Sequence, residues 1–525
     1  MYTTTKMAGI LFVFLAISAF KPENNNSKNS ECLDITVEGN HTHQTVHSFG
    51  ASDAWSCQFI GNWPEAKKNQ MAEWLFSSEM DKKGNALGIG LSCWRFNIGG
   101  GSAEQQSASG IKDEWRRSES FLNGTGQYDW SKHQGQRWFL QAAKKYGVKQ
   151  FTGFVNSPPV SLTRNQKAFS SDKDNFNMPA KNYEHFATYL ADVITHFKSE
   201  EGIHFEYISP INEPQWDWID GGQEGTPATN IEVVQTCRII DRVFKEREIQ
   251  TKIDIPESAQ LNYLYENDNR PGRGDQINSF FNPSSVTYIG NLKSVAKKIA
   301  GHSYFTTWPL QKQAEVRTKL KNAVDNSPEP IEFWMTEYCL LEDNEEIKGN
   351  TRDLTMKTAL YVARVIFSDL VFANACSWQW WVSITPYDYK DGLIYTDKNK
   401  TDGNFYDSKL LWTLGNFSRF IRPGMKRVTV SRNDGLTDDQ TLDQQLMTTA
   451  FISENDQKLS VVVINQKENE IPLRMNFSNL EVGSKLKIYL TDDNSLNNLT
   501  LMGHYTEGDV IKIPPRSVVT ITNQY

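Results

Sequence analysis

The feature that most constrains this chain is an alternation of short apolar runs and helix-like stretches between His47 and Gly415. The runs are His47–Ala51, Ser92–Asn97, Gln150–Asn156, Phe205–Asn212, Lys252–Pro256, Ile299–Ser303, Phe333–Thr336 and Ala375–Gln379. Apolar residues recur at helical spacing between them, as in Gln134–Tyr146, Tyr183–Phe197, Ile231–Lys245 and Thr355–Phe372. Eight strand-then-helix units predict an α/β fold of the (β/α)8 TIM-barrel type.

A doubly wound open sheet is the alternative arrangement of such units. That fold opens its first helix with a glycine-rich phosphate loop, and this chain has none there. Gly99-Gly100-Gly101 follows the second predicted strand, but no Lys-Ser/Thr completes a P-loop. We therefore expect a tight turn at these glycines and favour the barrel.

The pattern of apolar runs and turn residues changes after Arg422-Pro423-Gly424. Short β-rich runs separated by Asn, Asp, Gly and Ser are typical of an antiparallel β-sandwich. Leu33–Thr45 also has a strand pattern and could join that sandwich from the N-terminal side. The predicted order is a signal peptide (1–20), a linker (21–31), an N-terminal strand of the side sandwich (32–46), the catalytic barrel (47–417) and the C-terminal β-sandwich (418–525).

The first residues have the composition of an export signal. Lys6 precedes the apolar run Met7–Phe20, which is too short for a stable membrane anchor. We expect a protein that is secreted or periplasmic after removal of this peptide. The other long apolar stretch, Thr358–Val382, contains Arg364 and Asp369 and predicts a buried helix followed by a strand, so no membrane span is expected.

The net charge, the cysteines and the histidines argue against several classes of function. A net charge of −8 argues against a nucleic-acid partner. The six cysteines form no C-x-x-C pair, which gives a zinc or redox motif little support, and no cofactor is expected. His41, His43 and His47 are spaced so that their side chains would face the same side of one strand-like stretch. Without a carboxylate or cysteine nearby, they do not predict a metal site. The sequence leaves the oligomeric state open.

Two glutamates are the strongest candidates for chemistry. Glu213 and Glu337 each lie just past a predicted strand, and all such strand ends face one mouth of a barrel. Pro210, which lacks an N–H, predicts a short or irregular strand just before Glu213. Two converging carboxylates can divide the acid and nucleophile roles of glycosidic cleavage.

Motifs around these glutamates resemble clan A glycoside hydrolases, and further segments in order resemble glycoside hydrolase family 30. Asn212-Glu213-Pro214 and Thr336-Glu337-Tyr338 carry the clan likeness. The family likeness rests on Ser48–Trp55, Trp94–Gly100, Asn156–Pro159, His302–Tyr304, Ser377–Trp381 and Leu414–Gly424. The resemblance covers nearly the whole chain after the predicted linker, including a side sandwich built from both ends.

The resemblance implies that Glu337 is the nucleophile and Glu213 the general acid/base of a retaining mechanism. It implies that Asn212 binds the sugar 2-hydroxyl, and that Tyr304 and Arg95 act on Glu337. Trp378 would floor the −1 subsite. The remaining substrate-binding candidates are Trp55, Asn156, His302 and Trp216.

Structural explanations stay open for several of these residues. Arg95 could form a structural ion pair, Tyr304 and Trp378 could be packed core aromatics, Asn212 could cap a turn, and His302 could be a satisfied buried histidine.

Within the family, Asn212–Trp218 and Gly221–Gly225 resemble the endo-β-1,6-galactanase branch, which acts on arabinogalactan-type side chains. The expected partner is therefore a polysaccharide substrate. An endo-β-1,6-glucanase or a xylanase of the same family is the alternative. Two other classes remain to be tested: a non-catalytic carbohydrate-binding protein and a metal-dependent hydrolase.

Overall fold

The computed structural model describes residues 32–524 apart from 455–456 and 484. The predicted signal peptide and linker, residues 1–31, lie outside the described residues.

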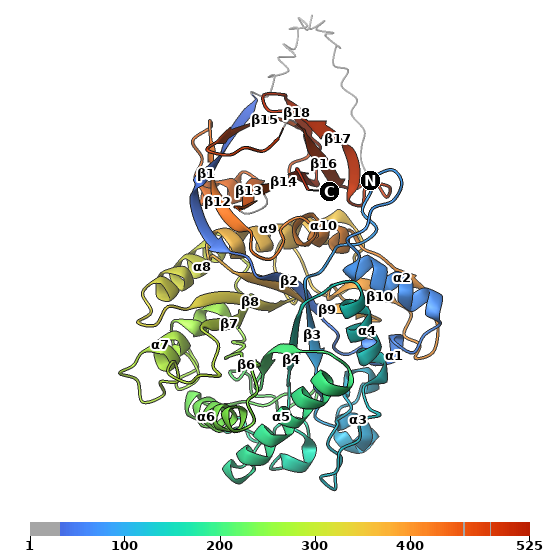
Figure 1. Ribbon diagram of the computed structural model, residues 1–525, viewed down its shortest axis with the longest axis vertical. Helices are drawn as coiled ribbons and strands as arrows, with labels where there is room; N and C mark the ends of the chain where they lie inside the picture. The colour runs from blue at the N-terminus through green and yellow to red at the C-terminus, as the bar shows by residue number, and fades with distance from the viewer. Residues whose placement is uncertain (1–31, 455–456, 484, 525) are drawn as a thin grey trace, which may run out of the picture. The chain divides into compact units, whose positions relative to one another are not determined.

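The eight predicted barrel strands are present and parallel, and Figure 1 shows them at the centre of a ring of helices. They are β2 (Ser48–Ser52), β3 (Cys93–Asn97), β4 (Gln150–Phe154), β5 (Phe205–Ser209), β6 (Lys252–Ile253), β7 (Lys298–His302), β8 (Glu332–Tyr338) and β9 (Ser377–Thr385). Strand β5 ends one residue before Pro210, which explains how the proline is accommodated. The fold is therefore a TIM-type α/β barrel, as predicted.

The ring closes through irregular pairing between β6 and β7. Strand β9 pairs with both β2 and β8, and β8 pairs with β7. On the other side β6 is very short, and the isolated parallel bridges Ile253–Val295 and Ser258–Gly301 connect β6 and the segment that follows it to the β7 side. The irregular segment after β6 thus lies at the mouth, next to the end of β7. A β10 (Gly392–Thr396) and β11 (Phe405–Tyr406) extension lies beyond β9.

The helices around the strands are α1 (Cys57–Ile60), α2 (Glu65–Phe76), α3 (Ser102–Gln105), α4 (Gln134–Lys145), α5 (Tyr183–Glu200), α6 (Asn230–Glu246), α7 (Gln276–Phe281), α8 (Leu310–Asp325), α9 (Met356–Val371) and α10 (Lys409–Ser418). Every residue of helix α9 except Lys357 is buried, because the helix lies between the barrel strands and the second sheet. Helix followed by strand is what the sequence predicted for this apolar stretch. Within the described part of the chain, none of the helices combines the length and hydropathy that a membrane span requires.

The second sheet has nine strands and its own apolar core. Its strands are β1 (Leu33–Thr45), β12 (Lys426–Arg432), β13 (Leu446–Ser453), β14 (Lys458–Asn465), β15 (Ile471–Ser478), β16 (Leu486–Thr491), β17 (Thr500–Tyr505), β18 (Ile511–Ile513) and β19 (Ser517–Thr522), with α11 (Asp438–Asp443) before β13. The sheet is antiparallel as predicted except where β1 pairs in parallel with β15. Because β1 comes from the distant N-terminal side of the chain, no tight turn dictates its direction.

Polar contacts join this sheet to the barrel helices. The Asn416 side chain donates to the Thr520 hydroxyl at 3.0 Å, and that hydroxyl donates to the Asn416 carbonyl at 2.7 Å. Gln466 donates to the carbonyl of Leu360 in α9 at 3.0 Å. The sheet therefore contacts the outside of the barrel, away from the mouth where the polar side chains converge.

Candidate active site

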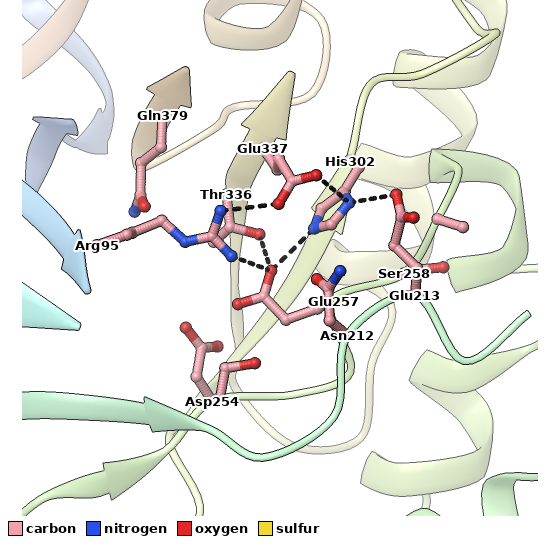
Figure 2. A network of polar contacts seen from close by, with 12 residues as sticks. Arg95, Asn212, Glu213, Asp254, Glu257, Ser258, His302, Thr336, Glu337 and Gln379 are labelled. Carbon is pink, nitrogen blue, oxygen red and sulfur yellow. Dashed lines mark hydrogen bonds and ion pairs between the residues drawn. The ribbon is translucent and has the colours of Figure 1, made fainter. Parts of the chain in front are cut away.

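Polar side chains from five barrel strands or their C-terminal extensions meet at the mouth, as Figure 2 shows. They are Arg95 of β3, Asn212 and Glu213 after β5, Glu257 after β6, His302 of β7 and Glu337 of β8. Parallel strands bring their carboxyl ends to the same edge, so residues far apart in sequence become neighbours.

The backbone conformation of Glu213 and its backbone hydrogen bonds orient the side chain. Its φ is +45°, in the left-handed region that a non-glycine residue rarely occupies. The peptide N–H donates to the Glu257 carbonyl at 2.9 Å, while the Glu213 carbonyl accepts from the Trp218 indole at 3.0 Å. These contacts fix the direction of a side chain that is only 6% exposed, and strain of this kind is common at functional sites.

Glu337 lies within β8 rather than just past it, because that strand extends beyond the predicted end at Thr336. Arg95 donates to its Oε2 at 2.9 Å and the Tyr304 hydroxyl to its Oε1 at 3.0 Å. Both donors stabilise negative charge on this carboxylate. Arg95 and Tyr304 thus take the places expected of them beside Glu337.

The two glutamates face each other across a short gap. One carboxylate oxygen of Glu213, one of Glu337 and a ring nitrogen of His302 all lie within 4.8 Å of one another. Carboxyl groups about 5–5.5 Å apart fit a retaining glycosidase, whereas an inverting one needs about 6.5–9.5 Å for an attacking water. The separation of these carboxylate oxygens is therefore closer to the retaining range than to the inverting one.

Burial separates the two carboxyl groups chemically. It raises the pKa of Glu213 to about 7, although the hydrogen bond from His302 opposes the shift. Glu337, in contrast, accepts hydrogen bonds from a guanidinium and a phenol. A carboxyl group whose pKa burial raises, beside one that accepts hydrogen bonds from a guanidinium and a phenol, is a pairing suited to acid and nucleophile roles.

His302 bridges the acid residues. Its Nδ1 lies 2.9 Å from Glu213 Oε1 and its Nε2 lies 3.0 Å from Glu257 Oε2. Burial acts against the charged ring, but the Glu337 charge and these two hydrogen bonds outweigh it and raise the His302 pKa to about 10. A ring that donates from both nitrogens has no lone pair for a metal, although Glu213, His302 and Glu337 are close enough to share one.

Glu257 was not predicted from the sequence. It directly follows the predicted run Lys252–Pro256, so its place after a strand was the one signal available. Its carboxylate is completely buried, and although burial works against the anion, the Arg95 charge and the His302 hydrogen bond lower its pKa to about 2.

A cavity of about 510 Å³ opens over the two glutamates. Aromatic and polar side chains line it, namely Trp55, Arg116, Trp216, Trp218, Gln223, Tyr304, Phe305, Trp381, Tyr389 and Asp391. Trp55 and Trp381 meet edge to face at 5.3 Å. The sequence pointed to Trp55 and Trp216, while Arg116, Trp218 and Trp381 were not predicted.

Asn156 and Asn212 form a pair beside the glutamates. The Asn212 amide donates to Asn156 Oδ1 at 3.1 Å. Asn212 Oδ1, Asn156 Nδ2 and the Trp55 indole nitrogen are buried without a hydrogen-bond partner among the described residues. Buried polar atoms of this kind are suited to pair with sugar hydroxyls.

Trp378 does not lie at the cavity. Its side chain is fully buried and its indole donates at 2.8 Å to Asp369 of α9, so it points outward from the barrel. Side chains alternate along a strand, and Gln379 lies on the inner side near Arg95 in Figure 2. The expectation that Trp378 floors the subsite is therefore corrected: Trp381 is the β9 tryptophan at the cavity.

The glycine turn and the three histidines considered above as ligand sites are bound to groups of the protein itself. The turn at Gly100 binds a side chain of the protein itself, because Glu224 accepts from the Gly100 N–H at 2.8 Å and from the Ser102 N–H at 3.2 Å. His41 pairs with Glu38, His43 with Thr429, and His47 with Glu332. These three histidines do not converge.

The chain is similar to known proteins in sequence and in fold. A sequence profile of O-glycosyl hydrolase family 30 matches residues 32–395. The chain is 27% identical over 414 residues to an endo-β-1,6-galactanase of Hypocrea rufa, which covers 75% of this chain and 76% of that protein. The crystal structure of a conserved exported protein from Bacteroides fragilis is 34% identical, covers 93% of this chain and 99% of that one, and has a TM-score of 0.86.

The fold also recurs at lower identity. The catalytic domain of xylanase C from Talaromyces cellulolyticus is 19% identical, covers 94% of this chain and 100% of that one, and has a TM-score of 0.65. The family 30 profile extends from β1 into β10 and includes both glutamates. The chain is therefore an O-glycosyl hydrolase and belongs to O-glycosyl hydrolase family 30.

Proposed function

We propose that this protein is a secreted, retaining endo-β-1,6-galactanase acting on arabinogalactan-type side chains, with Glu337 as nucleophile and Glu213 as general acid/base. The observation that carries the catalytic part is the approach of the two carboxylates within 4.8 Å, one raised in pKa by burial and the other held by Arg95 and Tyr304. The galactanase named in Hypocrea rufa supports the choice of glycan.

The proposed reaction has two steps. A Glu337 oxygen attacks the anomeric carbon and forms an ester bond, while the carbon–oxygen bond to the leaving sugar breaks and that oxygen takes the proton of Glu213. Glu213, now an anion, accepts a proton from water as the water attacks the anomeric carbon and releases Glu337. Two displacements at one carbon retain its configuration.

Asn212, Asn156 and the Trp55 indole are proposed to bind sugar hydroxyls, since each carries a buried polar atom without a partner among the described residues. Trp216 lies at the rim, against Phe305 at 6.2 Å and under Arg270. Because Trp381 and Trp55 line the cavity, we assign to them the stacking role that the sequence gave to Trp378.

The test is a product profile on β-1,6-galactan, β-1,6-glucan and glucuronoxylan, with proton NMR of the first anomer released. We expect a ladder of short galactan oligosaccharides in the β-configuration. Release of single sugars contradicts endo action, and an α-anomer contradicts retention. Turnover of only the glucan or the xylan identifies one of the family alternatives, and glycan binding without turnover identifies a carbohydrate-binding protein.

Azide distinguishes the roles of the glutamates. Because azide replaces the missing nucleophile in Glu337→Ala, it should restore turnover of an activated substrate and give an α-glycosyl azide. In Glu213→Ala the glycosyl-enzyme still forms, so azide should give the β-azide. Activity that survives a strong chelator excludes a metal-dependent hydrolase.

Export is part of the same proposal, with residues 1–20 as signal peptide, 21–31 as linker, 47–417 as the catalytic barrel, and 32–46 with 418–525 as the side domain. The basic and apolar N-terminus and the exported relative from Bacteroides fragilis support it. N-terminal sequencing of protein recovered outside the cytoplasm should begin after residue 20, whereas an intact Met1 contradicts cleavage.

A further inference from the structure

Glu257 is a buried acid next to the reacting groups that does not line the cavity. It follows the short strand β6 and has a φ of +53°. A single oxygen, Oε2, lies 2.5 Å from the Thr336 hydroxyl, 3.0 Å from His302 Nε2 and 3.5 Å from Arg95 Nη2 (Figure 2). A group so placed acts on the reaction through its neighbours.

His302 connects Glu257 to the acid/base residue. Its Nδ1 lies 2.9 Å from Glu213 Oε1 and 3.6 Å from Glu337 Oε1. Both ring nitrogens therefore face carboxylate oxygens, and both must donate. Because Oε1 of Glu213 accepts from the ring, the proton that Glu213 gives to the leaving sugar has to reside on Oε2.

The charges of this group balance at both stages of the reaction. With Glu337 as nucleophile and Glu213 as acid, as proposed above, the resting group combines the cations Arg95 and His302, the anions Glu257 and Glu337, and a neutral Glu213. In the glycosyl-enzyme Glu337 is an uncharged ester and Glu213 is an anion, so the sum is again zero. Glu257 is the anion that does not change between the two stages.

We propose that Glu257 is a positioning residue that keeps His302 protonated on both nitrogens and thereby directs the catalytic proton of Glu213 to Oε2. The proposal rests on the role proposed above for Glu213. It differs from a purely structural role because it requires the negative charge of Glu257 and not only its shape.

The groups that face His302 come from several elements. They are the carboxylates of Glu213, Glu257 and Glu337 and the Tyr304 ring at 5.8 Å. Burial raises the Tyr304 pKa well above its usual value, so the phenol is neutral. Arg95 reaches the same carboxylates, and Lys298 holds Asp254 on the far side of Glu257 in a buried pair.

Glu257→Gln removes the charge and keeps the shape. His302 then loses an anionic partner, and a neutral ring accepts through Nδ1, so that Glu213 places its proton on Oε1, away from the leaving sugar. Glu213 itself also loses a nearby anion that helps it keep its proton. Both effects reduce the population of the reactive acid as pH rises.

We expect the basic limb of the kcat/KM profile to move to lower pH by about one unit or more in Glu257→Gln, because an opposite charge in contact shifts a pKa by about 1–3 units. Turnover of a glycan should fall more than turnover of an aryl glycoside with an acidic phenol, which leaves without protonation. Glu257→Asp retains the charge and should retain the limb. An unmoved limb in Glu257→Gln overturns the proposal.

Glu342→Gln is the matched control. Glu342 is also a buried glutamate, and it accepts from the hydroxyls of Thr307 and Tyr338 instead of from His302. Glu342→Gln should change the melting temperature without shifting the basic limb of the kcat/KM profile. An equal limb shift in this variant would attribute the effect to general loosening and overturn the proposal.

A direct measurement does not depend on any substrate. In protein labelled with ¹⁵N-histidine, both His302 nitrogens should have N–H shifts at pH 8, with the signal assigned by its loss in His302→Gln. In Glu257→Gln one nitrogen should become unprotonated within the pH range studied. A ring that stays doubly protonated in the variant overturns the proposal even if the protein hydrolyses no galactan, so this result is independent of the glycan assignment.

Discussion

The Tyr304 hydroxyl donates a 3.0 Å hydrogen bond to Oε1 of Glu337, the carboxylate whose other oxygen Arg95 holds at 2.9 Å. The same hydroxyl lies 3.8 Å from the Cys339 thiol at the cavity wall. Glu337, the proposed nucleophile, is thus oriented from both sides, by a permanent cation and by a neutral phenol. These two donors have different consequences when removed.

Tyr304→Phe removes one neutral donor and leaves the Arg95 pair intact. We expect kcat to fall about 10- to 100-fold, since a hydrogen bond to a charged group contributes about 1.5–3 kcal/mol, while KM changes little. Steady-state kinetics on one galactan measures this, and the melting temperature of the variant serves as the control. A raised KM with unchanged kcat would show that Tyr304 binds substrate instead of orienting Glu337.

The pH dependence follows from Glu213. Burial raises its pKa to about 7, and the general acid must be protonated to act. We expect kcat/KM to decline above about pH 7, approaching tenfold per pH unit, and Glu213→Gln to lack this limb on an activated aryl glycoside. A profile that is flat from pH 6 to 9 in the wild-type protein would contradict the assignment.

The same shift affects stability. A raised carboxyl pKa favours the folded state at low pH, and this contribution is lost as pH rises through about 7, where the buried group ionises. Glu213→Gln has no charge to bury. Its melting temperature relative to the wild-type protein should therefore be higher at pH 8 than at pH 5, by about 2–4 °C. Calorimetry at the two pH values measures this, and an equal difference at both contradicts it.

The sequence was sufficient for the barrel and for the glutamate pair because both depend on local pattern. Apolar runs bounded by polar residues mark strands, and parallel strands bring their carboxyl ends together whatever the details of packing. Glu213 and Glu337 meet for that reason. The nine-stranded sheet was predicted only in outline, because strands such as β17 are half exposed and weakly apolar and so give little signal in the sequence.

The direction of individual side chains and the buried network of charged groups could not be predicted from the sequence. Trp378 and Trp381 stand three residues apart on β9, and only the register of that strand decides that the first faces α9 and the second faces the cavity. Glu257 directly follows the predicted run Lys252–Pro256, but nothing in the local sequence distinguishes it from other residues that follow a strand. Its importance comes from contacts with Arg95 and His302, which are distant along the chain.

The two tryptophans of β9 give a paired prediction. Trp381→Ala removes an aromatic face from the cavity, so KM should rise about tenfold, equivalent to about 1.4 kcal/mol, and because Trp381 is also largely buried the variant should lose some stability as well. Trp378→Ala empties a buried space and leaves Asp369 without its indole partner, so it should destabilise the fold by about 3–5 kcal/mol. Measuring KM and the free energy of unfolding for both variants tests the correction. The opposite pattern would return the subsite role to Trp378.

The last prediction concerns Glu224, which fastens the loop after β5 to the glycine turn after β3. Its carboxylate accepts from the N–H groups of Gly100 and Ser102 and from the Ser102 hydroxyl. A Cβ at Gly100 would lie 3.1 Å from the carbonyl oxygens of Ser157 and Pro158, so the turn has little room to rearrange. Loss of Glu224 therefore leaves buried donors unpaired.

We expect Glu224→Ala to lower the free energy of unfolding by at least about 2 kcal/mol, because each unpaired buried donor costs about 1–3 kcal/mol. KM should also rise, since the same loop carries Trp216, Trp218 and Gln223 to the cavity. Asp220→Ala, an exposed acid on that loop, is the control and should change neither quantity appreciably. A Glu224→Ala protein with wild-type stability and KM would show that the loop is held by its aromatic contacts and not by this carboxylate.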